Sequence, residues 1–377
     1  MKTIKYLKFT VFLTVFFLYL LSAVFSKEIF KINSSEITKH GLDYAKSYVM
    51  GFTKNSKYLL IVDKERNPEL IKQGQNTKIL VIPINNPKEK FLIYTPAYKI
   101  ENYINFNENE ILLIVNNSTS ILKLDLEARK VVKEYKLVEK GKEGIRLKAG
   151  FYCMENEKDI YLMGSFFNKD QIFEDPNYYW IKTEFNDKIN FTQKVTNITE
   201  VENKVGKVRM FYWSSPYSAV FTKFINDRPS ELYYYTKGNL NLIDVQYYIF
   251  EIALYKQKFI IYPYSKDKES LVNYLGIYDI GNNKKFTYAG LYKKPLVYPF
   301  VNNNGLIIIA TLDMEKKQMD FYFTSESENM IFHRFIAEYP AGSFKISDEN
   351  FYSLQTKDFI SVGKVEKTPN EKSMKPL

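Results

Sequence analysis

The sequence has 377 residues but only one cysteine and two histidines. A single cysteine forms no intramolecular disulfide, and three such side chains cannot complete a structural zinc site. Cys153 lies in an apolar run at residues 150–154, which predicts a small buried side chain rather than a reactive thiol. Calcium bound by Asp and Asn in loops stays open as an alternative, although no EF-hand spacing occurs. We therefore expect no cofactor and no dedicated metal site.

Motifs typical of the large enzyme classes are absent as well. The sequence contains no Walker loop, no dinucleotide-binding fingerprint and no Gly-x-Ser-x-Gly elbow. Ser120 and Lys123 have a Ser-x-x-Lys spacing, but that motif works on a helix and these residues begin a predicted strand. His333 alternates with Ile331 and Phe335, so it is predicted to be a core side chain rather than a general base.

Helical patterns are scarce, whereas residues that favour strands are abundant. The 31 Tyr and 29 Phe residues raise the aromatic content to 16%, and aromatic and β-branched residues favour pleated surfaces. An apolar run at residues 111–115, an alternating run at 121–126 and a third run at 131–137 follow one another with short polar turns between them. Only residues 35–46 are typical of a helix, with Ser34 or Ser35 as its cap. We therefore predict an all-β fold of antiparallel strands.

This order of strands and turns recurs along the chain at intervals of about 48 residues. The strongest apolar strands begin near residues 57, 110, 159, 217, 258, 305 and 350. Four-stranded blades of β-propellers have repeats of about 40–50 residues. In its spacing and strand order the chain resembles β-propellers as a class, which implies about seven four-stranded blades. Six blades, or two β-sandwiches in tandem, are the alternatives.

The two ends of the repeat array complement each other. The last repeat, residues 344–365, is one strand short, and residues 28–32 before the first repeat have strand character. We predict that this N-terminal strand completes the last blade, because ring closure removes exposed sheet edges. The propeller domain is then expected to cover residues 27–365, followed by a disordered tail at residues 366–377.

The N-terminus has the pattern of an export signal. Three lysines precede an apolar run at residues 9–25, and small side chains at positions 24 and 26 allow cleavage before Lys27. Residues 1–26 are predicted to be a signal peptide. The alternative is a retained signal-anchor helix, since about 17 apolar residues are the lower limit for a membrane span. The protein is expected to be secreted, periplasmic or on the cell surface, and to contact a membrane only through this segment if it is retained.

The formal net charge of +10 raises the question of an anionic partner. The lysines are scattered among Asp and Glu and form no block of five or six. Most of them are therefore predicted to cover solvated faces and strand edges. We expect no nucleic-acid partner.

Large aromatic side chains are the candidates for a binding surface. The predicted binding face, for a sugar or a peptide, consists of Trp180, Trp213, Tyr212 and Tyr217. The alternative is that these rings pack between blades, as large aromatic side chains commonly do.

A strand-built scaffold with variable loops and no catalytic signature is typical of a binding protein. We predict an exported, non-enzymatic propeller that binds a protein or glycan partner. The alternative is a glycosidase-like hydrolase, which needs two carboxylates about 5–10 Å apart near the central channel. The candidate acids at predicted strand ends are Asp63, Glu65, Asp313 and Glu315.

Overall fold

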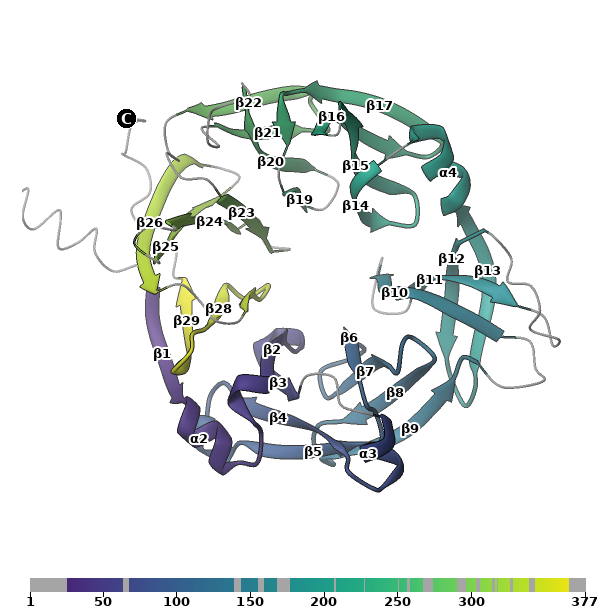
Figure 1. Cartoon of the computed structure of the whole chain (residues 1–377), viewed down its shortest axis with the longest axis vertical. Helices are drawn as coiled ribbons and strands as arrows, with labels where there is room; N and C mark the ends of the chain where they lie inside the picture. Colours follow the sequence, from purple (N-terminus) through teal and green to yellow (C-terminus); the bar gives the residue numbers. More distant parts are fainter. Residues whose placement is uncertain are drawn as a thin grey trace, which may run out of the picture.

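The structure is a computed structural model of the whole chain. It describes residues 26–63, 68–138, 144–154, 159–167, 177–206, 208–226, 228–249, 251–255, 258–266, 274–289, 296–302, 306–313, 316, 318–325, 328–338 and 343–365. Within these ranges, seven antiparallel sheets stand around a common axis as a closed ring (Figure 1). Six sheets have four strands, and in the remaining one the two short strands β18 and β19 both pair with β20. The prediction of an all-β propeller is therefore confirmed.

The blades are numbered along the chain from the one that contains β2. Blade 1 contains β2 (Ser47–Phe52), β3 (Tyr58–Asp63), β4 (Thr77–Pro83) and β5 (Phe91–Thr95). Blade 2 contains β6 (Ile100–Asn105), β7 (Glu110–Val115), β8 (Ser120–Asp125) and β9 (Lys130–Lys136). Blade 3 contains β10 (Gly144–Met154), β11 (Ile160–Phe167), β12 (Tyr179–Phe185) and β13 (Ile189–Asn197). Blade 4 contains β14 (Val208–Ser215), β15 (Ser218–Ile225), β16 (Arg228–Thr236) and β17 (Asn239–Val245).

The other three blades follow the same order. Blade 5 contains β18 (Tyr248–Ile249), β19 (Ala253–Tyr255), β20 (Phe259–Ser265), β21 (Tyr274–Asp279) and β22 (Lys284–Ala289). Blade 6 contains β23 (Leu296–Val301), β24 (Leu306–Asp313), β25 (Gln318–Ser325) and β26 (Glu328–Glu338). Blade 7 contains β27 (Phe344–Ile346), β28 (Phe351–Gln355), β29 (Phe359–Val365) and β1 (Ser26–Asn33).

The second strand of each blade is the one that the sequence marks most clearly. All six residues of β3 are buried, and so are five of the six residues of β7. A second strand has neighbouring strands on both edges and packed blades on both faces, so its sequence is a nearly continuous apolar run. The spacing of about 48 residues is therefore the spacing between successive second strands.

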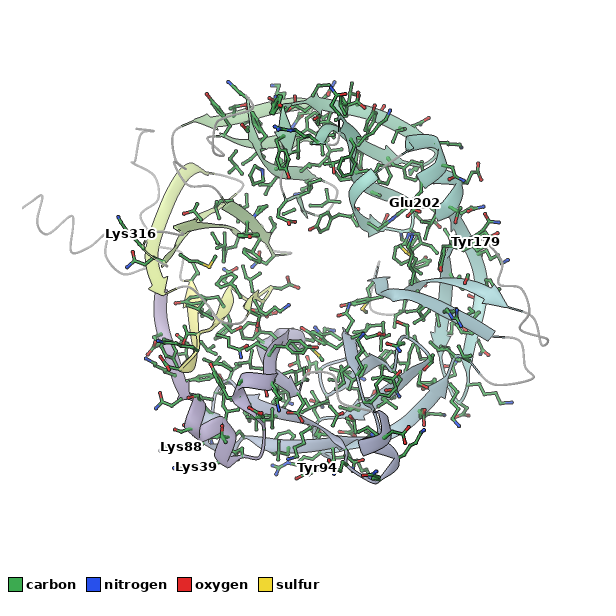
Figure 2. The ribbon with its side chains drawn as sticks, in the orientation of Figure 1. Lys39, Lys88, Tyr94, Tyr179, Glu202 and Lys316 are labelled. Atoms are coloured by element: carbon green, nitrogen blue, oxygen red, sulfur yellow. The ribbon has the colours of Figure 1, made fainter. Side chains whose placement is uncertain are left out.

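The core lies between successive blades rather than in one central mass. Val62 and Val81 of blade 1 pack with Leu113 of blade 2, and Ile114 of blade 2 packs with Leu162 of blade 3. The outermost strands face solvent instead, as the labelled Tyr94 on β5 shows at the periphery of the ring (Figure 2). Each blade thus covers the apolar faces of its neighbours, which is why one repeat cannot be stable alone.

The N-terminal strand completes the last blade, as predicted. β1 pairs antiparallel with β29, with Ile32 opposite Ile360. The backbone N–H of Ser34 continues this contact by donating to the carbonyl of Asp358 at 2.8 Å. Blade 7 is therefore built from both ends of the described chain, and this pairing holds the ring closed.

The helix predicted over residues 35–46 is shorter than expected. The structure has α2 (Ser34–Lys39), followed by a single 3-10 turn at Tyr44–Lys46. Gly41 lies between them with φ +91°, a left-handed conformation that ends helices and favours glycine. The residue at the N-cap is Asn33, and its side chain makes no capping hydrogen bond, so the prediction of a serine cap was wrong.

Two further helices, α3 (Pro68–Lys72) and α4 (Ile198–Val205), were not predicted. Helix α4 begins with a conventional cap, because the Oδ1 atom of Asn197 accepts a hydrogen bond from the backbone N–H of Glu200 at 3.1 Å. In the part of the chain that the structure describes, no helix has the length and apolar character to cross a membrane. The predicted signal segment lies outside that part except for Ser26, the first residue of β1.

Candidate binding site

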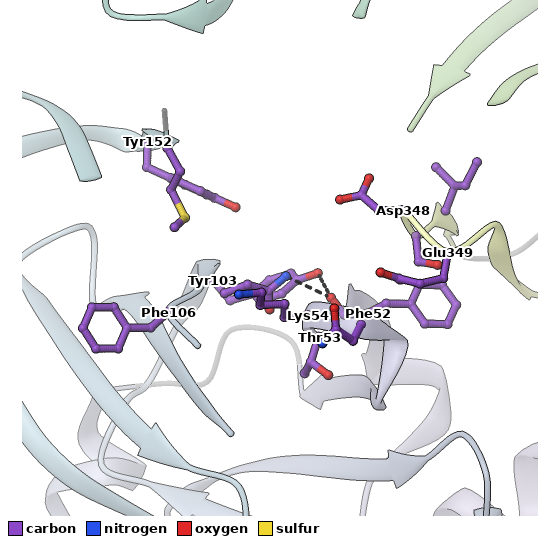
Figure 3. A pocket seen from close by; sticks show the side chains of 13 residues that line it. Phe52, Thr53, Lys54, Tyr103, Phe106, Tyr152, Asp348 and Glu349 are labelled. Atoms are coloured by element: carbon purple, nitrogen blue, oxygen red, sulfur yellow. Dashed lines mark hydrogen bonds between the residues drawn. The ribbon is translucent and has the colours of Figure 1, made fainter. Parts of the chain in front are cut away.

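A cavity of about 570 Å³ lies at the inner rim of the ring (Figure 3). Its walls come from four consecutive blades, numbers 7, 1, 2 and 3, mostly where the first strand of each blade ends. The aromatic side chains in the wall are Phe52, Tyr103, Phe106 and Tyr152. The charged ones are Lys54, Asp348 and Glu349. The cavity is therefore a product of ring closure, since blade 7 and blade 1 meet there.

Irregular first strands aim these side chains at the cavity. The pairing of β2 with β3 shifts register between Val49 and Gly51, and the pairing of β6 with β7 shifts between Ile100 and Asn102. Such β-bulges bend a strand and re-aim its side chains. The shift in β6 is followed directly by Tyr103, whose side chain reaches across to blade 1.

Tyr103 fits against blade 1 because Gly51 has no side chain. A Cβ atom at Gly51 would lie only 2.3 Å from the Tyr103 hydroxyl oxygen. That hydroxyl donates a hydrogen bond to the carbonyl of Phe52 at 2.7 Å. Burial raises the pKa of Tyr103 well above its ordinary value, and the nearby Tyr152 and Asp348 raise it further. The phenol therefore stays neutral and serves as a hydrogen-bond donor at any physiological pH.

The turn at residues 53–56 forms one wall, and its backbone is strained. Asn55 and Ser56 have φ values of +57° and +49°, and each non-glycine residue in this region costs about 1 kcal/mol or more. Carboxylates from both neighbouring blades hold the turn in place. Asn55 Nδ2 donates to Glu108 Oε1 of blade 2 at 2.8 Å, and the Ser56 hydroxyl donates to Glu349 of blade 7. The wall is therefore positioned by contacts across two blade junctions.

The cavity is locally acidic although the chain is basic. Its wall contains two carboxylates and one ammonium group, whereas the whole chain has a formal net charge of +10. Figure 3 shows Asp348 and Tyr152 on opposite sides of the opening, with Tyr103 between them in this view. Among the described residues, no group of three or more His, Cys, Asp or Glu side chains is arranged to hold a metal ion.

One amide in the wall has an unused acceptor. Asn105 Nδ2 donates to the carbonyl of Phe52 at 3.4 Å, whereas Asn105 Oδ1 is buried and has no hydrogen-bond partner among the described residues. An unsatisfied buried acceptor costs about 1–3 kcal/mol. A ligand group that donates a hydrogen bond to this amide would offset that cost.

The four aromatic residues predicted as a binding face do not form one surface. Trp180 is completely buried between blades 3 and 4, and its ring lies 5.9 Å from that of Trp213 at an interplanar angle of 69°. This burial supports the alternative that the Trp180 ring packs between blades. Trp213 is half-buried and also contacts Phe221 and Tyr235 within blade 4.

The two tyrosines of that predicted face are exposed instead. Tyr212 and Tyr217 each retain 40% of their surface. The Tyr212 hydroxyl donates to Glu251 Oε2 at 3.3 Å, and burial together with this carboxylate raises the pKa of Tyr212 to about 12. Both residues belong to blade 4, and neither is among the described residues that line the cavity.

Of the four predicted carboxylates, the two that the structure describes, Asp63 and Asp313, lie in different blades. Asp63 is buried at the end of β3 opposite Ser47, and its Oδ2 atom accepts a hydrogen bond from the backbone N–H of Lys78 at 3.3 Å. Asp313 ends β24 in blade 6, with blade 7 between it and blade 1. Glu65 and Glu315 lie outside the described residues. The acids that do share a cavity, Asp348 and Glu349, lie in the turn between β27 and β28.

The sequence analysis did not single out these two acids, which lie in the short last repeat. The acidic turn Ser347–Asp348–Glu349–Asn350 directly after a first strand was the available signal. Cys153 lies in β10 opposite Tyr161, and His333 lies in β26 opposite Phe323. The structure describes the backbone of these two residues but not their side chains.

The ring of blades and the cavity at its inner rim define the chain as a β-propeller with a candidate ligand site near its axis. The sequence matches no protein-family model, and none of the curated proteins compared with it matches either.

Proposed function

We propose that this chain is an exported, non-enzymatic β-propeller that binds a protein or glycan partner through the cavity at its inner rim. The observation that carries the proposal is the cavity itself, with a volume of about 570 Å³ and walls from four blades. Ligand sites are typically cavities of about 300–1,000 Å³ with aromatic walls and a few polar groups at fixed positions. Tyr103, Phe106 and Tyr152 supply such walls, and Asn105 and Asp348 supply such groups.

A glycosidase-like hydrolase is the second candidate, since Asp348 and Glu349 lie in one cavity. Two features favour binding over catalysis. Glu349 accepts a hydrogen bond from the Ser56 hydroxyl, which gives this carboxylate a structural role in the adjacent turn. The two acids are also consecutive residues of one turn, whereas the two carboxylates of a glycosidase must flank the scissile bond.

Export is proposed from the N-terminal lysines and the apolar run that follows them. Cleavage before Lys27 would remove only Ser26 from β1 and would leave seven residues, numbers 27–33, to pair with β29. Mass spectrometry of the mature protein is expected to find Lys27 as the first residue. An intact N-terminus in a membrane fraction would favour the signal anchor instead.

The binding proposal is tested by filling the cavity. Met154→Trp places a large ring in the wall, and Leu242→Trp places the same ring on the outer strand β17, where Leu242 is 53% exposed. The exported chain and both variants are screened against a glycan array and a panel of extracellular protein fragments. We expect at least one ligand that binds the wild type and Leu242→Trp but not Met154→Trp, with equal thermal stability of the two variants as the check on folding.

Tyr152→Ala is the second cavity variant, because it removes a ring rather than adding one. A ligand that binds both cavity variants as tightly as the wild type would refute the proposed site. Release of a cleaved product from any glycan, lost in Glu349→Gln, would favour the hydrolase.

A further inference from the structure

The charge of the cavity restricts the kind of ligand that fits it. Asp348 and Glu349 outnumber Lys54 in the wall, and Glu108 adds a further carboxylate where it accepts the hydrogen bond from Asn55. An anionic ligand would be repelled by this excess of carboxylates. A cationic ligand gains from the same arrangement.

The aromatic walls favour a cation for a second reason. A cation over the face of a tyrosine or phenylalanine ring is attracted by the negative potential of that face, and more strongly when the contact is shielded from water. The chain makes this contact within its own blades, where Lys194 Nζ lies 4.4 Å from the ring centroids of both Phe166 and Tyr179. Tyr103 and Tyr152 supply rings to the wall of the cavity, with Tyr152 across the opening from Asp348.

The cavity contains several hydrogen-bond acceptors, and two of the donors in its wall are already engaged. The Tyr103 hydroxyl and Asn55 Nδ2 already donate to the carbonyl of Phe52 and to Glu108. The acceptors include the carboxylates of Asp348 and Glu349 and the unpartnered Oδ1 atom of Asn105. A group with several donors and no acceptor complements this set. A lysine ammonium has three such donors and an arginine guanidinium has five.

We infer that the partner is a protein that inserts a lysine or arginine side chain into the cavity, beside the Asp348 carboxylate and the Tyr103 and Tyr152 rings. This inference rests on the proposed function and specifies its ligand. A neutral glycan, the other macromolecular partner considered, lacks the positive charge that the cavity complements.

Matched small probes test the inference on the full exported chain by calorimetric titration. The cationic probes are Nα-acetyl-arginine amide and Nα-acetyl-lysine amide, and the neutral probes are the citrulline and norleucine analogues, which keep the shapes of the side chains. We expect the cationic probes to bind at least about tenfold more tightly than their neutral partners, with affinity that falls as salt is added. N-acetylglucosamine and its dimer serve as the glycan probes.

Two variants change the charge of the cavity in opposite directions. Asp348→Asn is expected to weaken binding of the arginine probe about tenfold or more, because it removes a negative charge that attracts the guanidinium of the probe. Lys54→Met is expected to strengthen binding of the same probe, because it removes a like charge from the wall. Asp187→Asn is the control, since Asp187 is fully exposed beside Lys133 on the outer side of the ring. Thermal unfolding of each variant checks that the fold is intact.

The outcomes separate the inference from the proposal on which it rests. Equal binding of arginine and citrulline probes, or no loss in Asp348→Asn, overturns the inference. So does the absence of binding by either cationic probe up to about 20 mM, which is well above a dissociation constant of about 1 mM. A glycan that binds the wild type and is lost in Met154→Trp would overturn the inference while leaving the proposed function intact. A partner that binds Met154→Trp normally would overturn both.

Discussion

Gln355 provides the sharpest test of how the ring is closed. It ends β28 in blade 7, and its side chain is only 3% exposed. Its Oε1 atom accepts a hydrogen bond from the backbone N–H of Val49, and its Nε2 atom donates to the carbonyl of Ser47, both at 3.1 Å. Val49 and Ser47 belong to β2, the edge strand of blade 1. The side-chain amide of Gln355 in blade 7 thus provides hydrogen-bond partners for two backbone groups on the edge strand of blade 1.

Replacing this amide by a side chain of similar size isolates its contribution. Gln355→Leu leaves two buried backbone groups without partners, and each costs about 1–3 kcal/mol. We expect the free energy of unfolding to fall by about 2–5 kcal/mol, since the extra apolar burial of leucine offsets part of the loss. Gln193→Leu, on the exposed strand β13, is the control and is expected to change stability by less than about 0.5 kcal/mol.

Chemical denaturation followed by both fluorescence and circular dichroism measures this difference, and coincidence of the two transitions validates the free energy. Gln355→Glu adds a test of sign. The protonated acid can donate to Ser47, whereas the carboxylate cannot, so the folded state should raise the pKa of this group. Its stabilising effect is then present below the unfolded pKa of about 4.3 and is lost as the pH rises through the folded pKa. If Gln355→Leu unfolds within about 0.5 kcal/mol of the wild type, the account of ring closure is wrong.

Three further predictions concern other contacts within the blades. Deleting β1 (Ser26–Asn33) leaves the edge of β29 unpaired, so we expect a lower melting temperature and concentration-dependent aggregation, and partial rescue by a peptide of residues 26–33 in trans. The Asp244 carboxylate accepts a hydrogen bond from the Tyr262 hydroxyl at 2.7 Å and forms an ion pair with Lys285, so Asp244→Asn should cost about 2–4 kcal/mol in urea unfolding. Burial raises the pKa of Tyr262, and the hydrogen bond to Asp244 raises it further. The stability contributed by this tyrosine is therefore present below its unfolded pKa of about 10 and is lost as the pH rises through the folded pKa. Ultraviolet titration should find a lower pKa for Tyr262 in Asp244→Asn. Burial lowers the pKa of Lys345 on β27, so Lys345→Met should raise the melting temperature at pH 7, and its advantage should shrink as the pH approaches about 10.5, where the unfolded lysine also loses its proton.

The sequence was most informative where a strand is buried on both faces. Leu60 and Leu113 belong to second strands with almost no exposed residues, and the apolar runs of such strands predicted the repeat length and the fold class. The large aromatic residues were less informative. Trp180 is fully buried and Tyr212 is 40% exposed, although they are of the same chemical kind. The difference is set by which side of a strand faces the next blade, and composition does not encode that side.

The first strands were the elements that sequence reasoning located least well. Register shifts interrupt them in blades 1 to 4, for example between Val49 and Gly51 in β2 and between Val208 and Met210 in β14. Each shift adds a residue that breaks the alternation of apolar and polar side chains, so a search for a period of two loses the strand at that point. The polar residues of β6, which include Glu101 and Asn102, weaken the signal further.

The same irregularity that hides the first strands also builds the cavity. If β6 kept a regular alternation through Glu101, Tyr103 would lie on the opposite face of blade 2 and could not reach the carbonyl of Phe52 in blade 1. The shift in β2 places Gly51 beneath that ring, where any side chain would collide with it. Fold and site therefore depend on opposite features of the sequence. The ring is specified by uninterrupted apolar runs in the second strands, and the cavity by bulges in the first strands, so a pattern that finds the one passes over the other.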